Sequence, residues 1–300
     1  MNVRWWHQCA LVFCFFLCFL SNTMAAGVKY PLRFLRPYKP GDKFLVTGSG
    51  VAKRRMVYKR GRRVFKSKRF NTNYRYKAVL TILAVHRHKQ PSQEMHKILR
   101  FQKKIGGRWM NVFPAGTFVL GKAIREKRRF TVNGYPVSKD EARLLKVFSR
   151  LTSASMASVN SIFKTSGMKR IGQSWGVNPV VANSFLTDSQ YLFKPKYVRG
   201  KTRLTKLRTV NGLTCLQLDG RLKVYPIHYK VRFRVKKQKG FLKLWYRGYY
   251  PLSPARQVQA FQLGSRSKIE VVQFPVPGMP PTRLLVTARV QYRVFAKRLR

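Results

Sequence analysis

Four titratable residues could hold a metal ion at one end of a hairpin. His86 and His88 lie on one face of an expected strand, and Glu94 and His96 lie on one face of the next. A turn about Pro91 would place His86 opposite His96 and His88 opposite Glu94, with paired Cβ atoms about 5 Å apart. Imidazole and carboxylate groups at that separation can share a divalent cation.

The charge around this patch favours a simpler interpretation. Lysine or arginine occupies positions 87, 89 and 97, and these side chains repel cations. A shift of one residue in the turn would also break the alignment. We therefore expect solvent-facing polar residues at a hairpin end and predict no metal site. A metal-dependent enzyme built on this patch is the least favoured of the functions considered.

Carboxylates are too few to suggest acid–base catalysis. A helix cap accounts for Asp140 and Glu141, and turns account for Asp42 and Asp219. The other acids form no catalytic pair, and the chain has no Walker or Cys-x-x-Cys motif. The sequence therefore predicts a protein that is not an enzyme and needs no cofactor. The acidic residues are Asp42, Glu94, Glu126, Asp140, Glu141, Asp188, Asp219 and Glu270.

The excess of basic residues indicates anionic partners. Lysine and arginine number 63 against 8 aspartates and glutamates, which gives a formal charge of +55. A surface of this kind attracts polyanions whatever their sequence. We expect non-specific association with anionic lipid headgroups, acidic polysaccharide or other polyanions such as nucleic acid.

The densest basic run lies at residues 53–69, where hydrophobic residues such as Tyr58 and Phe65 interrupt it. One interpretation is a polyanion-binding hairpin. The other is a solvated hairpin tip, because positive charge continues through residues 194–208, 230–243 and 289–300. Both interpretations remain open from the sequence. The cations of the run are Lys53, Arg54, Arg55, Lys59, Arg60, Arg62, Arg63, Lys66, Lys68 and Arg69.

Residues 1–26 have the pattern of an export signal. Arg4 precedes an uncharged apolar run at residues 9–20, and Ala25 and Ala26 offer a cleavage site. The apolar run is short for a bilayer span, which takes about 20 residues, although an uncleaved N-terminal anchor is the alternative. We expect an exported protein, in the periplasm or outside the cell and associated with the envelope.

The rest of the chain divides into an extended lead-in at residues 27–41 and a single β-rich domain at residues 42–300. The tetrapeptide Thr-Val-Asn-Gly occurs at residues 131–134 and again at 209–212. This leaves open a division of the domain into two similar halves, about 42–151 and 165–300. Cys215 is the one cysteine outside the signal, so a hydrophobic core rather than an internal disulfide must hold the fold.

Most of the domain alternates apolar and cationic residues with a period of two, which is typical of half-buried antiparallel strands. The alternation is clear at Val231, Phe233 and Val235 and again at residues 286–294. Further strands are expected at residues 43–51, 74–88, 95–104, 116–124, 202–208, 213–218, 241–249, 258–264 and 268–274. Asn133-Gly134 and Asn211-Gly212 predict hairpin turns of the primed types.

Helices are expected only in the middle of the chain. Ser138 and Glu141 form a capping box before an apolar stripe that ends at Leu151. A second helix is expected within residues 153–163, and a third from Asn178, with proline at its first position, through Phe185. The fold class is therefore α+β: a strongly curved, mainly antiparallel sheet, like a half-barrel, with a few central helices on one face.

The motifs Gly172-Gln173-Ser174-Trp175, Val177-Asn178-Pro179 and the hairpin leading to Cys215 resemble those of uncharacterised exported proteins of planctomycetes and related bacteria. The resemblance implies no activity for any residue. The fold pattern is also similar to the half-barrel of periplasmic lipoprotein carriers, and this similarity is an analogy of fold alone.

Two functions follow as hypotheses. The first is a non-enzymatic exported envelope protein whose cationic surface associates with anionic envelope components. The alternative is a carrier that binds a lipophilic ligand in a half-barrel cavity lined by residues such as Val231, Phe233 and Val235. The aromatic residues Trp245, Tyr246, Tyr249 and Tyr250 could line a ligand groove, although such clusters more often belong to the core.

Overall fold

The computed structural model describes residues 27–32, 37–86, 89–124, 127–151, 162–163, 167–187, 191–229, 235–253, 256, 260–273 and 282–299. Strands account for most of this chain. The N-terminal half contains β1 (Lys29–Pro31), β2 (Lys43–Arg60), β3 (Arg63–Val85), β4 (Pro91–Ile105), β5 (Arg108–Phe113), β6 (Phe118–Ile124), β7 (Lys127–Val132), β8 (Tyr135–Pro136) and helix α2 (Lys139–Phe148). The C-terminal half contains β9 (Met168–Arg170), β10 (Ser174–Gly176), helix α4 (Pro179–Thr187), β11 (Tyr191–Leu192), the 3-10 helix η1 (Pro195–Tyr197), β12 (Val198–Val210), β13 (Leu213–Val224), β14 (His228–Tyr229), β15 (Val235–Pro251), β16 (Ala260–Gln273) and β17 (Thr282–Arg298).

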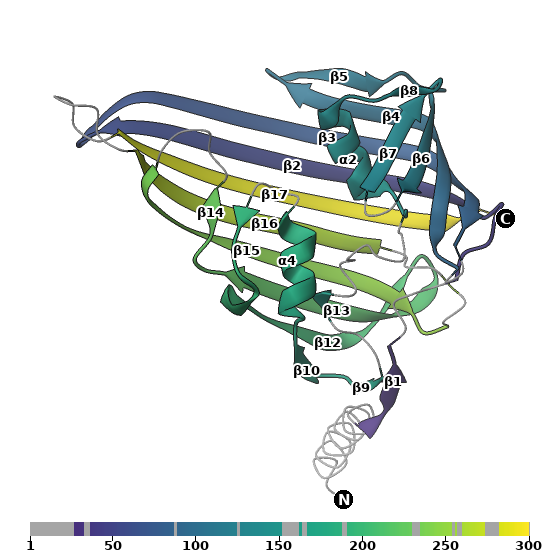
Figure 1. The fold of residues 1–300 in the computed structure, drawn as a ribbon. Helices are drawn as coiled ribbons and strands as arrows, with labels where there is room; N and C mark the ends of the chain where they lie inside the picture. The colour runs from purple at the N-terminus through teal and green to yellow at the C-terminus, as the bar shows by residue number, and fades with distance from the viewer. Residues whose placement is uncertain are drawn as a thin grey trace, which may run out of the picture.

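Thirteen of these strands form one sheet, in the order β10-β12-β13-β15-β16-β17-β2-β3-β4-β6-β7-β8 with β5 paired to β4. All of its ladders are antiparallel, and the path is open, with β10 and β8 at its two ends. Both helices lie over the same face of the sheet (Figure 1). The expected α+β class, with a mainly antiparallel sheet and few helices, is confirmed. In the described part of the chain, no helix combines the length and the apolar character needed to cross a membrane.

Several strands are longer than the sequence predicts. The basic run was expected at a hairpin, and it forms the distal halves of β2 and β3, which are 18 and 23 residues long. Residues 258–264 and 268–274 were expected to form two strands, but β16 runs unbroken through Gly264. That glycine is accommodated because the indole ring of Trp245 on β15 lies over it. Side chains therefore continue to alternate between the two faces of the sheet through Gly264, where the sequence indicates a break between two strands.

The local signals of the sequence are confirmed where the structure describes them. At the start of α2, Glu141 N–H donates to Ser138 Oγ at 3.3 Å, and Ser138 N–H donates to Glu141 Oε2 at 2.8 Å. Helix α4 begins at Pro179. Asn133 and Asn211 have φ values of 50° and 52°, as primed turns require. The helix expected within residues 153–163 lies mostly outside the described residues.

Each helix covers its own hydrophobic core. Beneath α2, the ring of Phe148 stacks on Tyr76 with centroids 4.1 Å apart, and Leu145 and Leu151 are fully buried. Beneath α4, Ala182 and Leu186 pack against apolar residues of β12, β13 and β15. The face of the sheet that carries these cores is called the helix face below.

Gly48 on β2 allows α2 to approach the sheet, because a Cβ there would overlap the ring of Phe148. We predict that Gly48→Ala lowers the free energy of unfolding by about 1–3 kcal/mol, as overpacking of a filled core does. Urea unfolding would measure the loss. Gly176→Ala is the matched control, since nothing lies within 4 Å of its Cβ position, and a change within about 0.5 kcal/mol is expected there. Equal losses in both variants would contradict this role of Gly48.

Candidate functional site

The hairpin register that the metal interpretation requires is wrong. His96 lies opposite Leu80 and Glu94 opposite Ile82, while His86 bonds through its backbone to Gln90 in the turn. The turn closes sooner than expected, so His86 does not face His96. His88 lies outside the described residues. Within the part of the chain that the structure describes, no three His, Cys, Asp or Glu side chains are grouped to hold a metal ion.

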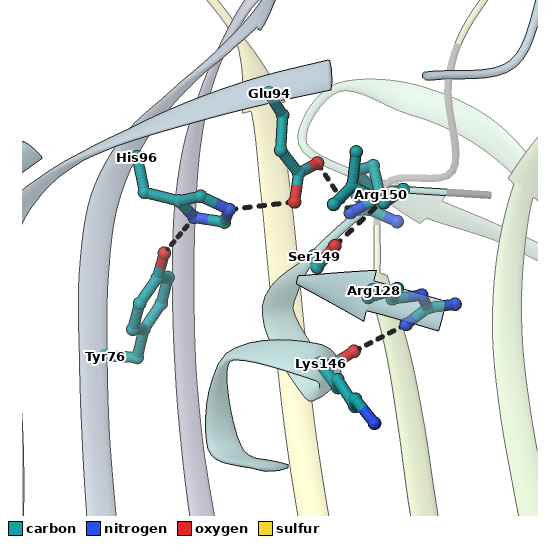
Figure 2. A network of polar contacts seen from close by, with 8 residues as sticks. Tyr76, Glu94, His96, Arg128, Lys146, Ser149 and Arg150 are labelled. Carbon is teal, nitrogen blue, oxygen red and sulfur yellow. Dashed lines mark hydrogen bonds and ion pairs between the residues drawn. The ribbon is translucent and has the colours of Figure 1, made fainter. Parts of the chain in front are cut away.

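Glu94 and His96 instead belong to a buried network on the helix face (Figure 2). His96 Nε2 lies 2.8 Å from Glu94 Oε1, and His96 Nδ1 lies 2.5 Å from the hydroxyl of Tyr76. Glu94 Oε2 accepts the backbone N–H of Arg150 at 2.9 Å. The sequence placed these side chains in solvent, but Glu94 and His96 are both 0% exposed.

This network holds the end of α2 against the sheet. Arg150 follows the C-cap residue of α2, Ser149, so the bond to Glu94 anchors the chain where the helix stops. Burial alone would raise the pKa of Glu94, but the ion pair and hydrogen bond with His96 and the bonds from Ser149 and Arg150 outweigh it and lower that pKa. Burial raises the pKa of Tyr76 well above its ordinary value. The network therefore ties the end of α2 to β3 and β4 through buried polar contacts.

We predict that this network makes the protein sensitive to acid. Because the pKa of Glu94 is lower in the folded state than its ordinary 4.5, its stabilisation is present above that value and is lost as pH falls through the folded pKa. Glu94→Gln should cost about 1–3 kcal/mol at neutral pH and flatten the acid limb of the unfolding free energy. Urea unfolding between pH 7 and pH 3 would measure both effects.

Tyr76→Phe is the control for this experiment, because it removes a hydrogen bond of the same network and leaves the carboxylate in place. Its acid limb should match that of the unmodified protein. An acid limb that persists unchanged in Glu94→Gln would contradict the assignment.

The opposite face of the sheet, here called the cationic face, carries the charge. One register row crosses six adjacent strands and presents a cation on every one of them. Each of the six side chains is exposed. The strands pair without a register shift at this row, and neighbouring rungs lie about 4.8 Å apart. The row consists of Arg199 on β12, Lys223 on β13, Lys243 on β15, Arg266 on β16, Arg289 on β17 and Lys53 on β2.

This row, called the cationic row below, is unusual because like charges directly opposite each other destabilise a sheet. Among the described carboxylates, only Asp219 and Glu270 lie on this face, and neither is in the row. Adjacent register rows add more exposed cations: Lys201 and Arg221 on one side, and Arg55, Arg69 and Lys268 on the other. The repulsion is relieved by water and salt, and an anionic ligand would relieve it further.

A hollow of about 850 Å³ lies at one end of the cationic face, between β12 and β16. Its side-chain lining combines Trp245 with the cations Arg199, Lys201, Arg221, Lys223, Lys243 and Arg247, and with Asp219 and Gln262. Asp219 binds Arg247 Nε at 2.6 Å and also accepts Thr205 Oγ1 at 2.8 Å and Gln217 Nε2 at 3.0 Å. Burial alone would raise the pKa of Asp219, but these hydrogen bonds outweigh it and lower the pKa.

The basic run at residues 53–69 is divided by the sheet. Lys53, Arg55 and Arg69 lie on the cationic face, whereas Arg54 alternates to the helix face. Lys59, Arg60, Arg62, Arg63, Lys66 and Lys68 lie toward the distal end of the β2–β3 hairpin. The run therefore contributes one rung to the cationic row, and the other five rungs come from strands distant in sequence.

The aromatic cluster is also divided. Tyr246, Tyr249 and Tyr250 are buried, and the hydroxyls of Tyr246 and Tyr250 lie 2.5 Å apart, so the core interpretation is correct for them. Trp245 alternates to the cationic face and lines the hollow. The sequence signal for this site was the alternation within β15, where Phe241, Lys243, Trp245 and Arg247 occupy successive outward positions.

Comparison with protein-family models and with curated proteins finds no match. Among solved structures, a lipovitellin structure described as showing lipid–protein interactions aligns over 87% of this chain at 8% identity, with a TM-score of 0.38; the chain spans 25% of that protein. A loop-deletion mutant of OmpT, an outer membrane protein of Vibrio cholerae, aligns over 84% of this chain and 99% of its own at 8% identity, with a TM-score of 0.19. Superpositions this loose do not define a common fold.

Proposed function

We propose that this protein is a non-enzymatic binding protein of the cell envelope, exported by its N-terminal signal, that associates with linear polyanions through the cationic face. The observation that carries the proposal is the cationic row, in which six exposed cations of adjacent strands follow one line. A row with no carboxylate keeps its full charge for an external partner.

The direction of the row favours an extended ligand. Six rungs at about 4.8 Å span about 24 Å across the strands, which is long enough to engage several anionic groups of one chain. Each engaged cation releases a counterion, so affinity should fall steeply with salt. Acidic polysaccharides and the headgroups of an anionic lipid layer both present such repeated charges.

The lipophilic carrier receives less support. It would require the sheet to curl into a half-barrel around an apolar space on the helix face. The buried apolar residues of that face belong to the two cores, and Val235 packs against the core beneath α4. Val231 and Phe233 lie outside the described residues. No specific observation favours this function over polyanion binding.

We predict that removing three rungs of the row weakens the salt dependence of binding. The variant combines Lys53→Gln, Arg266→Gln and Arg289→Gln, none of which lines the hollow. For heparin and for phosphatidylglycerol vesicles, the slope of log affinity against log salt concentration should decrease in magnitude by about 2–3. Titrations at several salt concentrations would measure the slope.

A control of equal charge separates the row from net charge alone. Lys139→Gln, Arg143→Gln and Lys146→Gln remove three cations from α2, which covers the helix face. This variant should keep a slope close to that of the unmodified protein. Binding that is insensitive to salt, or equal losses in both variants, would overturn the proposal.

A further inference from the structure

The hollow includes three residues of the cationic row, Arg199, Lys223 and Lys243, and its lining combines an aromatic ring with charged groups. We infer that it binds an acidic sugar, a pyranose ring carrying a carboxylate, sulfate or phosphate, with the ring against Trp245 and the acidic group on the flanking cations. This inference rests on the proposed function, because it identifies the class of polyanion that the cationic face takes.

Trp245 is held as a platform by the strand beside it. Its register partner on β16 is Gly264, and a Cβ at that position would overlap the indole ring. The ring therefore occupies the space of the missing side chain and rests on the backbone of β16. An aromatic ring supported in this way, at the lining of a hollow, offers an apolar surface on which a flat ligand can pack.

Cations surround this platform on three sides. Arg221 lies directly opposite Trp245 on β13, at a Cβ separation of about 5 Å. Lys243 and Arg247 lie two residues before and after it on the same strand, each about 7 Å away along the chain. A ring packed on the indole would thus have a cation within reach of an acidic substituent at almost any of its edges.

Asp219 acts as a positioning residue for one of these cations. It engages Arg247 through Nε at 2.6 Å, and Arg247 also forms a hydrogen bond with the side chain of Tyr249, so the guanidinium is held from two sides. Thr205 and Gln217 in turn fix the carboxylate of Asp219. Gln262, opposite Arg247, adds an amide that can donate to or accept from a sugar hydroxyl.

The surroundings of Trp245 favour a sugar over a nucleic acid. A single-stranded nucleic acid is tracked by successive aromatic platforms for successive bases. Here the outward neighbours of Trp245 along β15 are Lys243 and Arg247, and across the sheet they are Arg221 and Gly264. One aromatic surface bordered by cations, an amide and a carboxylate suits one hydroxylated, charged ring. An acyl chain would instead cover these cations without pairing them, at a cost in desolvation.

The test compares Trp245→Ala with the unmodified protein by calorimetric titration of a heparin-derived tetrasaccharide. We expect binding about tenfold weaker in Trp245→Ala and largely restored in Trp245→Phe, which keeps an aromatic ring. Gly264→Ala should weaken binding to a similar extent, because its methyl group would displace the indole. Inorganic polyphosphate, which has charge but no ring, should bind all of these variants equally.

Trp109→Ala is the matched control, since Trp109 on β5 is also flanked by cations, with Arg75 4.3 Å from its ring centroid, but lies outside the hollow. It should leave the affinity for the tetrasaccharide unchanged. Titration of lipopolysaccharide, whose headgroup carries phosphorylated sugars, against the soluble tetrasaccharide shows whether the acidic sugar comes from a lipid or from a polysaccharide. A loss in Trp245→Ala with either ligand supports the inference.

Three results would overturn it. Trp245→Ala could leave tetrasaccharide and lipopolysaccharide binding unchanged, it could weaken polyphosphate binding as much as sugar binding, or an oligothymidylate could prove the ligand that depends most on Trp245. Each of these would leave polyanion binding by the cationic row intact. Failure of the proposed function itself would appear separately, as heparin binding that does not depend on salt.

Discussion

The ladder between β17 and β2 joins strands from opposite ends of the chain, and it runs without a register shift from Thr282 opposite Arg60 to Arg298 opposite Phe44. Side chains alternate between two faces along a strand, so a slip of one residue here would exchange the faces of half the sheet. The cores beneath α2 and α4 would then lose their alignment, and Lys53 would no longer continue the row that begins at Arg199. Both the packing of the helix face and the charge of the other face therefore depend on this register. The pairing of β17 with β2 also closes a long loop of chain. The conformational entropy lost in this step is offset only when the whole sheet has formed.

The fold tolerates its charge by separating functions between the two faces. The helix face carries most of the buried apolar residues that supply the stability, and a small cluster of Cys215, Tyr249 and Ala260 lies on the other face. The cationic face leaves its cations in water, where each neighbouring pair at about 4 Å or more costs no more than about 1 kcal/mol. Three of the few carboxylates hold other parts of the structure in place. Glu94 anchors the end of α2, Asp219 holds Arg247, and Asp42 pairs with Arg298 near the C-terminal end of β17. None of these three neutralises the cationic row, which is consistent with a surface that keeps its charge for a partner.

Local features of this structure could be predicted from sequence because their causes are local. The capping box at Ser138, the proline start of α4 and the Asn-Gly turns each depend on a few adjacent residues. The burial of His96 could not be predicted, because it depends on a bulged ladder with β3 and on a helix that covers it. The cationic row could not be predicted either, because each of its six cations comes from a different segment of the sequence. The row forms only when the six strands pair. The dense run at residues 53–69 suggested a single binding segment, but it contributes only one cation to the row.

The hollow shows how such a surface could acquire selectivity beyond charge. A row of exposed cations distinguishes polyanions poorly, because its interactions are screened by salt and demand little geometry of the ligand. Trp245 adds a contact that salt does not screen and that requires a ring at a defined place beside the charges. Its position depends on Gly264, a residue that would ordinarily weaken a strand interior. The indole covers the backbone at Gly264 and so compensates in part for the side chain that this glycine lacks, and the same packing holds the ring where a ligand could stack on it.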